Sequence, residues 1–379
     1  MKCLFCLLFI AQISTAALAQ NKWLKVPTSP QAYETLQLEK GVVQPWEDGS
    51  RTTQDGNSYQ CWYYDAHLND GSLFVISFNL REGTKLKKAL TPFISVDIVF
   101  ANGKKIGRTI RAKQAAFTSS TTNCDVHIGD SYFTGNLNQY HIHISDSLLQ
   151  MDIDMVRTAD SWRPETGIFN FGNDGKYAGW FVPVPEGTTH VTYTYKGITT
   201  TTTGKCYHDN TWWNQSPRKL FNNWFWAATD VGPYKIITYN ITATKKYHYE
   251  QQLSYAVFKN GKLLVDDYRK VGTQKSDDIM QTIGKKPLSK TTKFTYSDSI
   301  TTYTLVLNQK DILQSVATIK SNVTKQLVKL FTGFDGAYYR VKGVASFSVY
   351  QNGQLQNTYQ SDNAIWDSYF FANPPKISK

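Results

Sequence analysis

The segments that decide the fold are Tyr140-His141-Ile142-His143-Ile144 and Met151-Asp152-Ile153-Asp154-Met155, which follow one another closely in the chain. In both segments apolar and polar residues alternate, so that successive side chains of an extended backbone point to opposite faces. This alternation is typical of antiparallel strands with one face buried. The two segments therefore predict a pair of half-buried strands around a turn.

The same signals recur along the chain in both directions. The dipeptides Asn102-Gly103, Asn260-Gly261 and Asn352-Gly353 each lie between alternating runs, which is the strongest short-range indication of a β-hairpin. Helical periodicity is scarce. Only residues 311–330 could hold a helix, and their Val, Ile and Thr content disfavours one. We therefore predict an all-β chain built mainly of antiparallel strands.

The N-terminus has the pattern of a secretory signal. Met1-Lys2 is followed by an apolar run to Ile13 and by Ala17-Leu18-Ala19, an Ala-x-Ala cleavage site. The apolar run is too short to span a bilayer, and no later stretch approaches the required length. We predict a signal peptide over residues 1–19, a secreted or periplasmic mature protein and no transmembrane segment.

About 360 residues remain after cleavage, more than one core usually serves, so two domains are expected. The similarity between Val99–Lys104 and Val257–Lys262 is consistent with two related domains. The Thr199–Thr203 run, closed by Gly204, is a plausible seam. The predicted domains are residues 20–204 and 205–379.

Charge and cysteine content exclude several classes of protein. The 41 Lys and Arg residues against 30 Asp and Glu residues are spread along the chain, so no nucleic-acid partner is predicted. Beyond the signal, Cys61, Cys124 and Cys206 permit one disulfide at most. A Cys61–Cys206 bridge is one option, and we favour buried free thiols.

The chemistry-bearing residues gather between Tyr207 and Tyr234. Asp209 lies in sequence among four large aromatic residues: Tyr207, Trp212, Trp224 and Trp226. An apolar surrounding raises the pKa of a carboxyl group, and a neutral carboxyl group can donate a proton. Ring faces stabilise positive charge. Asp209 is therefore the candidate general acid, with a turn-capping role as the alternative.

The neighbouring His208 could orient Asp209 or relay a proton, or could serve only as a structural hydrogen-bonding group. His141 and His143 share a strand face, but no third ligand has suitable spacing, so no metal site is predicted. The chain beyond residue 19 has no Gly-x-Ser-x-Gly elbow, phosphate-binding loop or Cys-x-x-Cys pair. No cofactor is predicted.

Three stretches together resemble the carotenoid 1,2-hydratase (hydroxyneurosporene synthase) and AttH family. The family signature Gly-Tyr-His-Asp-His-Asn-Trp-Gly, with a following Trp-x-Trp and Gly-Pro-Tyr, is matched by Tyr207, His208, Asp209, Trp212, Trp224, Trp226 and Gly232-Pro233-Tyr234. The stretch Tyr59–Asp65 is similar to the family's Tyr-Glu-Trp-Trp-Tyr-Phe-Asp. A third match comprises Tyr338-Tyr339-Arg340 and Ala364-Ile365-Trp366-Asp367.

The sequence departs from the family at positions that bear on mechanism. Asn210 replaces the second His of the signature, and Trp213 replaces its final Gly. Gln60 stands where many relatives have Glu, and Cys61 where they have Trp. Because an amide does not titrate, a mechanism that needs a second His or a carboxylate at these positions is not expected here.

The resemblance implies two lipocalin-like antiparallel β-barrels with a pocket near their junction. It implies a set of substrate-binding residues, which comprises Trp62, Tyr64, Tyr207, Trp212, Trp224, Trp226, Tyr338 and Trp366. The predicted protein is an exported, cofactor-independent enzyme that uses Asp209 and His208 on a hydrophobic isoprenoid- or polyketide-like molecule. The predicted reaction is acid-assisted hydration, cyclisation or isomerisation of a C=C bond.

Two other functions fit the same aromatic composition. A lipocalin-like carrier would hold a hydrophobic ligand without turnover, and a secreted glycan-binding protein would stack sugars on exposed tryptophans. A buried Asp209 facing a cavity favours the enzyme, a cavity without it favours the carrier, and an open aromatic platform favours glycans.

Overall fold

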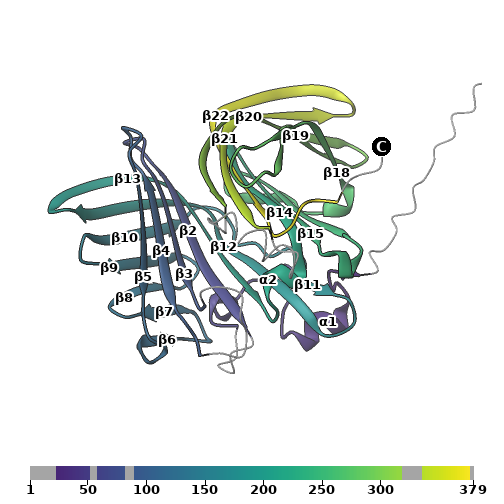
Figure 1. The fold of residues 1–379 in the computed structure, drawn as a ribbon. Helices are drawn as coiled ribbons and strands as arrows, with labels where there is room; N and C mark the ends of the chain where they lie inside the picture. Colours follow the sequence, from purple (N-terminus) through teal and green to yellow (C-terminus); the bar gives the residue numbers. More distant parts are fainter. Residues whose placement is uncertain (1–22, 52–57, 82–88, 318–334, 376–379) are drawn as a thin grey trace, which may run out of the picture.

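The computed structural model describes residues 23–51, 58–81, 89–317 and 335–375. These residues form two antiparallel β-sheets, a blue-to-teal one on the left of Figure 1 and a green-to-yellow one at its upper right. The all-β, lipocalin-like prediction is confirmed. In the described part of the chain, no helix has the length and apolar character needed to cross a membrane. The predicted signal peptide, residues 1–19, lies outside the described residues.

The first sheet has 13 strands, with the order β5-β4-β3-β2-β13-β12-β10-β9-β8-β7-β6 and with β1 and β11 attached beside β12. The strands are β1 (Leu24–Lys25), β2 (Tyr59–Leu68), β3 (Leu73–Asn79), β4 (Phe93–Val99), β5 (Lys105–Arg111), β6 (Phe117–Ser119), β7 (Cys124–Ile128), β8 (Ser131–Gly135), β9 (Gln139–Ser145), β10 (Leu149–Arg157), β11 (Ile168–Phe171), β12 (Lys176–Tyr195) and β13 (Ile198–Trp213). Over the described residues the ladder does not close between β5 and β6, so the sheet is a half-barrel, which is consistent with the predicted lipocalin-like fold.

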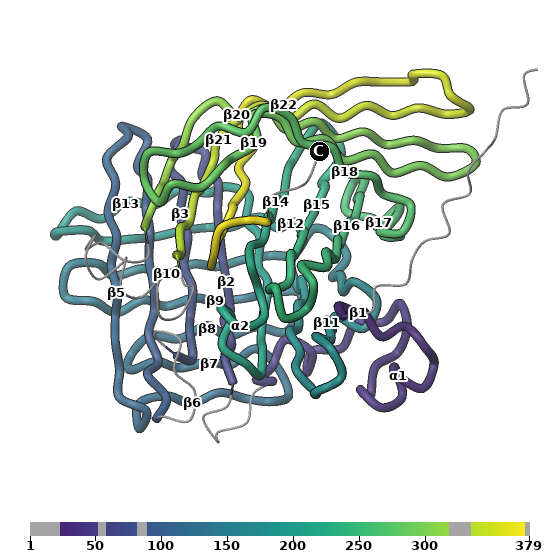
Figure 2. The backbone as a smooth tube through the Cα atoms, turned by 45° about the vertical axis from the view of Figure 1, so that its right-hand side comes forward, coloured from purple at the N-terminus to yellow at the C-terminus, as the bar shows by residue number. Residues whose placement is uncertain are grey.

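The second sheet has nine strands in the order β17-β16-β15-β14-β22-β21-β20-β19-β18. The strands are β14 (Phe221–Val231), β15 (Tyr234–Ala243), β16 (Gln251–Lys259), β17 (Lys262–Val265), β18 (Val271–Met280), β19 (Pro287–Ser297), β20 (Thr301–Ala317), β21 (Ala337–Gln351) and β22 (Gln354–Phe370). In Figure 2 most of this sheet lies above and to the right of the first sheet.

Helical segments are short and lie in the connections. They are α1 (Pro30–Thr35), η1 (Pro45–Asp48), η2 (Gln114–Ala116), α2 (Pro217–Leu220), η3 (Lys245–Tyr247) and η4 (Tyr268–Lys270). Residues 311–317 belong to strand β20, so this part of the only helix candidate is extended, as its β-branched content favours. The rest of that candidate, residues 318–330, lies outside the described residues.

The alternating segments form the predicted pair of strands. Strands β9 and β10 pair with Ile142 opposite Ile153 and His141 opposite Asp154. Except for the exposed Val156, the apolar residues of both strands are buried in the first-sheet core, while His141 and Asp154 point to the outer face. Each fully buried aliphatic side chain stabilises the fold by roughly 1.5–3 kcal/mol.

The three Asn-Gly pairs all form hairpin turns, between β4 and β5, β16 and β17, and β21 and β22. In the last two turns both residues have positive φ, 49° for Asn260 and Asn352 and 77° for Gly261 and Gly353. These angles are what a two-residue type I′ turn requires.

Strand β13 continues the first sheet beyond the predicted domain boundary. Residues 199–203 pair with β12, and residues 204–213 pair with β2, so the predicted seam is a strand and the boundary at 204–205 falls inside it. The first sheet ends at Trp213, and the second begins at Phe221. The Thr-rich run is extended because β-branched residues favour strands over linkers.

The two sheets share a hydrophobic core at their junction. This core joins Trp180 and Tyr207 of the first sheet to Trp226, Ile237 and Phe258 of the second. Beside it, the pairing of β12 with β13 shifts register twice between Phe181 and Gly187. Two prolines interrupt β12 there, and a proline cannot donate a ladder hydrogen bond. The β12 strand is therefore irregular directly beside the residues described next.

Candidate active site

A cavity of about 590 Å³ lies between the outer face of the first sheet and the second sheet. Its volume is in the range of small-molecule sites, which is roughly 300–1,000 Å³. We call it the junction cavity. Its lining comprises Cys61, Tyr63, Val75, Ser77, Asn79, Ser95, Asp97, Trp180, Asp209, Thr211, Trp213, Trp224, Trp226, Tyr239, Gln314, Val316, Tyr338, Arg340, Asp367 and Tyr369.

Asp209 is held in this cavity by two donors from the first sheet. The Tyr207 hydroxyl donates to Oδ2 at 2.8 Å, and the Trp180 indole N–H donates to the same oxygen at 3.1 Å. Among the described residues, none donates a hydrogen bond to Oδ1. The side chain is buried, with 7% of the residue exposed. One carboxyl oxygen is thus fixed by the protein while the other is available.

Burial governs the protonation of this carboxyl group. Loss of solvation raises the pKa of Asp209 to about 7, although the hydrogen bonds from Tyr207 and Trp180 and the nearby His208 favour the charged form. Because both donors occupy Oδ2, the proton of the neutral acid belongs on Oδ1. The neutral acid can therefore donate a hydrogen bond or a proton from Oδ1.

A buried ion pair faces the cavity from the second sheet. Arg340 on β21 bonds to Asp367 on β22 through Nε at 2.9 Å and through Nη2 at 2.7 Å. Nη2 also donates to the Tyr63 hydroxyl across the junction, at 2.8 Å. Burial opposes the charge, but the Asp367 carboxylate outweighs it and the pKa of Arg340 lies well above its usual value. Since Tyr63 pairs directly opposite Asp209, the cation and the acid serve the same cavity.

Aromatic rings from both sheets line the space around these polar groups. The ring of Trp226 lies 5.8 Å from that of Tyr63 and 5.1 Å from that of Tyr207. Trp180 and Tyr239 lie 4.9 Å apart, between centroids. The cavity therefore combines an apolar wall with one guanidinium, that of Arg340, and three carboxyl groups, those of Asp97, Asp209 and Asp367.

A smaller cavity of about 250 Å³ adjoins the junction cavity and shares Arg340 and Trp226 with it. It contains Asp65, where burial raises the pKa of the carboxyl group to about 6. In the β2–β13 register Asp65 lies opposite Tyr207, and Tyr63 lies opposite Asp209. Two Tyr-x-Asp triplets on adjacent antiparallel strands thus place two hard-to-ionise carboxyl groups on one face.

The structure brings together some of the predicted site residues and separates others. Asp209, Trp224, Trp226 and Tyr338 line the junction cavity. Tyr207 donates a hydrogen bond to Asp209. The remaining predicted residues lie elsewhere.

Trp62 and Tyr64 point into the first-sheet core, because alternate residues of β2 face opposite sides. Trp366 is buried in the second-sheet core for the same reason. Trp212 lines a different cavity, where its ring lies across Gly179 on the neighbouring strand. The substrate-binding role predicted for these four residues is therefore not supported by their positions.

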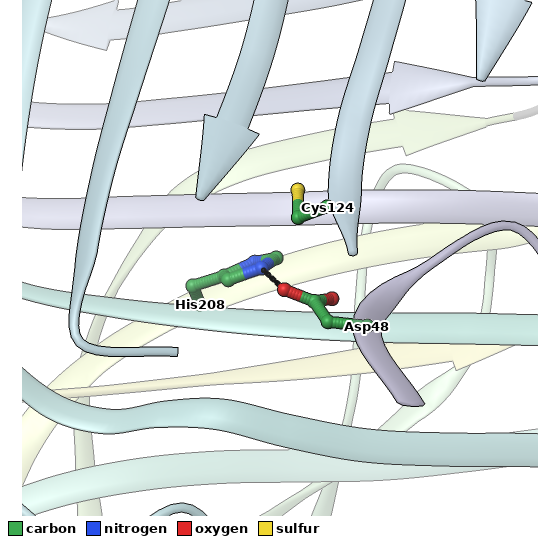
Figure 3. A group of neighbouring side chains, drawn as sticks. All are labelled: Asp48, Cys124 and His208. Carbon is green, nitrogen blue, oxygen red and sulfur yellow. Dashed lines mark hydrogen bonds and ion pairs between the residues drawn. The ribbon is translucent and has the colours of Figure 1, made fainter. Parts of the chain in front are cut away.

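His208 points away from Asp209 into the first-sheet core, which corrects the prediction that it orients the acid. Its Nδ1 bonds to the Tyr63 carbonyl oxygen at 2.8 Å, and its Nε2 bonds to Asp48 Oδ2 at 3.0 Å. Figure 3 shows this pair beside Cys124. Burial favours neutral His208, but Asp48 outweighs it and raises the pKa of the imidazole. The two side chains form a buried hydrogen-bonded pair, which is an ion pair when the imidazole is protonated.

Asp48, Cys124 and His208 carry donor atoms within 4.8 Å of one another, a spacing that could hold a metal ion. In this structure the same atoms bond to protein groups. Tyr140 donates to Asp48 Oδ2 at 2.7 Å, and burial raises the pKa of Cys124 well above its usual value, so that the thiol stays protonated. We interpret the cluster as structural. Cys61, Cys124 and Cys206 are free thiols, as we favoured.

Comparison with known proteins bears on both fold and function. A family model described as Diels-Alderase-like matches residues 56–316, which is more than half of the chain. A search of curated proteins gave no match.

Several solved structures share the fold. CghA, crystallised with Sch210972, is 12% identical over 88% of this chain and 96% of its own, with a TM-score of 0.60. An AttH protein from Nitrosomonas europaea is 13% identical over 92% of this chain and 100% of its own, with a TM-score of 0.58. Kievitone hydratase from Nectria haematococca is 13% identical over 88% of this chain and 94% of its own, with a TM-score of 0.54. The AttH-like fold that the sequence resemblance implied is thereby confirmed.

Proposed function

This chain belongs to the Diels-Alderase-like family, and we propose that it is a cofactor-independent enzyme acting on a hydrophobic small molecule bound in the junction cavity. The substrate we propose is isoprenoid-like or polyketide-like and carries a C=C bond, alone or conjugated to a carbonyl group. The reaction is hydration, cyclisation or isomerisation of that bond, assisted by Asp209 as an acid. The Diels-Alderase-like family model and one structural relative, kievitone hydratase, support this range of chemistry.

The observation that carries the proposal is the one-sided bonding of Asp209. Tyr207 and Trp180 both donate to Oδ2, and burial keeps the carboxyl group neutral up to a pH of about 7. A neutral acid with its proton on Oδ1 can hydrogen-bond a substrate carbonyl, which draws electrons from a conjugated C=C bond. The same proton can be transferred to an isolated alkene carbon, leaving a carboxylate that later regains a proton from the product-forming step.

The surroundings of Asp209 fit both versions of the reaction. Trp224 and Trp226 present ring faces that stabilise positive charge developing on carbon. Arg340 donates to the Tyr63 hydroxyl and can polarise it towards a second oxygen of the substrate. Water exclusion by the aromatic wall strengthens each of these interactions.

The same geometry separates the enzyme from its two rivals. Glycan binding favours an open platform, whereas Trp226 is 9% exposed and lies between the sheets. A carrier needs an apolar cavity but has no use for a desolvated acid, because keeping a carboxyl group out of water costs folding stability. A buried Asp209 on the cavity wall therefore favours turnover.

The test uses purified full-length protein incubated with a lipophilic extract of its source and with defined polyenes and isoprenoids. Mass spectrometry should detect a retained compound, and a product that has gained one water or has the same mass with a new retention time. Trp226→Ala should lose the product and the retained compound from which the product forms. Trp212→Ala, an equal truncation in the other cavity, should keep both. Equal loss in the two variants, or no retained compound with wild-type protein, would contradict the proposal.

A further inference from the structure

A second cavity, of about 850 Å³, lies on the opposite side of strands β12 and β13 from Asp209. On β12, Trp180 faces the junction cavity while the next residue, Phe181, faces this one. On β13, Thr211 and Trp212 are divided in the same way. Helix α1 forms part of the wall. The second cavity is thus separated from the proposed active site by one layer of the sheet.

Arg51 is the unusual residue of the second cavity. Its guanidinium carbon lies 4.1 Å from the ring centroid of Trp46 and 5.4 Å from that of Trp212. Its Nε donates to the Glu47 carbonyl oxygen at 3.3 Å. The described residues supply no carboxylate partner for its terminal nitrogens. With tryptophan rings beside it, the guanidinium offers its N–H edge as a bidentate donor.

Glu47, whose charge acts on Arg51, already has other partners. Glu47 pairs with Arg163, both side chains being almost fully buried, and it also accepts from the backbone N–H of Gln44 at 2.9 Å. Two guanidinium groups therefore face one carboxylate. Burial lowers the pKa of Arg51 to about 10; Glu47 partly opposes this and Arg163 adds to it. A partly desolvated cation without a counter-ion is costly, and an anionic ligand would remove that cost.

Part of the wall of the second cavity is apolar and suited to the body of a hydrophobic ligand. Its lining includes the apolar side chains of Ala32 and Leu36 from the α1 region and of Ile168 and Phe181 from the first sheet. We propose that the second cavity binds a hydrophobic monocarboxylate, whose carboxylate pairs with Arg51 and whose apolar body lies against Leu36, Ile168 and Phe181. This ligand site is distinct from the junction cavity and its chemistry.

The test is a fluorescence titration of the full chain with a conjugated polyene fatty acid and with the alcohol of the same carbon skeleton. Because a hydrogen bond to a charged group is worth more than a neutral one, the acid should bind at least about tenfold more tightly than the alcohol. Arg51→Gln should abolish that preference and Arg51→Lys should keep part of it. Equal binding of acid and alcohol by wild-type protein, or an undiminished preference in Arg51→Gln, would overturn the proposal.

Two further variants locate the bound acid. Ala32→Trp fills the second cavity without changing charge, and it should weaken binding of acid and alcohol alike. Trp226→Ala alters the junction side of the sheet alone and should leave the affinity for the acid unchanged. If Trp226→Ala weakens acid binding and Ala32→Trp does not, the acid binds at the junction and the proposal fails. These two results decide the matter even if Arg51→Gln does not fold.

Discussion

Replacing Asp209 with Asn should change how the stability of the protein depends on pH. In the folded protein, burial holds the pKa of Asp209 at about 7, against 3.8 for an unperturbed Asp. Between these two values the native state retains a proton that the unfolded chain has released. The raised pKa therefore contributes stability that is fully present below pH 3.8 and is lost as the pH rises through about 7.

The magnitude follows from the size of the shift. Raising the pKa from 3.8 to about 7 is a change of about 3 units, and each unit corresponds to 1.36 kcal/mol. Asp209 should thus lower the free energy of unfolding by about 4 kcal/mol between pH 4 and pH 8. The amide introduced by Asp209→Asn does not titrate, and its oxygen could still accept from Tyr207 and Trp180. The free energy of unfolding of the variant should therefore not show this decrease between pH 4 and pH 8.

The assay is denaturant unfolding of wild-type protein and Asp209→Asn at several pH values from 4 to 8. The difference between the two free energies of unfolding isolates Asp209, since other groups titrate equally in both. Asp230→Asn is a control of opposite sign, because Lys235 and Lys205 outweigh burial and lower the pKa of Asp230. The stability that Asp230 contributes is lost as the pH falls. Parallel curves for wild-type protein and Asp209→Asn would refute the reasoning.

Three other substitutions have definite expected outcomes. Asp48→Asn removes one partner of the buried pair with His208 and should cost roughly 3–5 kcal/mol in chemical denaturation, without altering retention of a compound in the junction cavity. Arg340→Gln leaves Asp367 buried without its cation; it should lower the melting temperature and slow turnover of carbonyl-bearing substrates in steady-state assays. Gly179→Ala would place Cβ 2.1 Å from the Trp212 ring, so calorimetry should show a destabilised protein, and unchanged stability would show that Trp212 moves freely.

The strands were predictable because their chemistry is local. The alternation around Ile142 and Ile153 reflects a sheet with one face in the core and the other exposed, and the Asn-Gly pairs carry their own turn geometry. Neither signal depends on distant residues. The continuation of β13 through the Thr-rich run was missed because β-branched residues were interpreted as a seam, although they favour extended pairing.

The candidate site was only half predictable, because β2 and β13 are covered on both faces. Where one face meets the first-sheet core and the other meets the second sheet, alternation does not identify the face that lines the cavity. Trp62 and His208 were therefore assigned to the wrong side. Arg340 was quoted only as part of a motif, since its role depends on Tyr63, which is 277 residues away.

One signal could have identified the site. Tyr63-Tyr64-Asp65 and Tyr207-His208-Asp209 are both Tyr-x-Asp triplets, and each lies in a strand of the structure. In an extended strand the first and third residues share a face, so each tyrosine lies beside its own aspartate. Pairing of the two strands then places both carboxyl groups on that face.

The central claim is that neutral Asp209 donates a proton or a hydrogen bond to a ligand in the junction cavity. The most direct measurement is the turnover of an identified substrate by wild-type protein and by Asp209→Asn at pH 6 and pH 8. We predict that the turnover rate of the wild-type protein falls from pH 6 to pH 8. Asp209→Asn should bind the substrate but turn it over about a hundredfold or more slowly than wild-type protein at both pH values. Turnover by folded Asp209→Asn at the wild-type rate would contradict the claim.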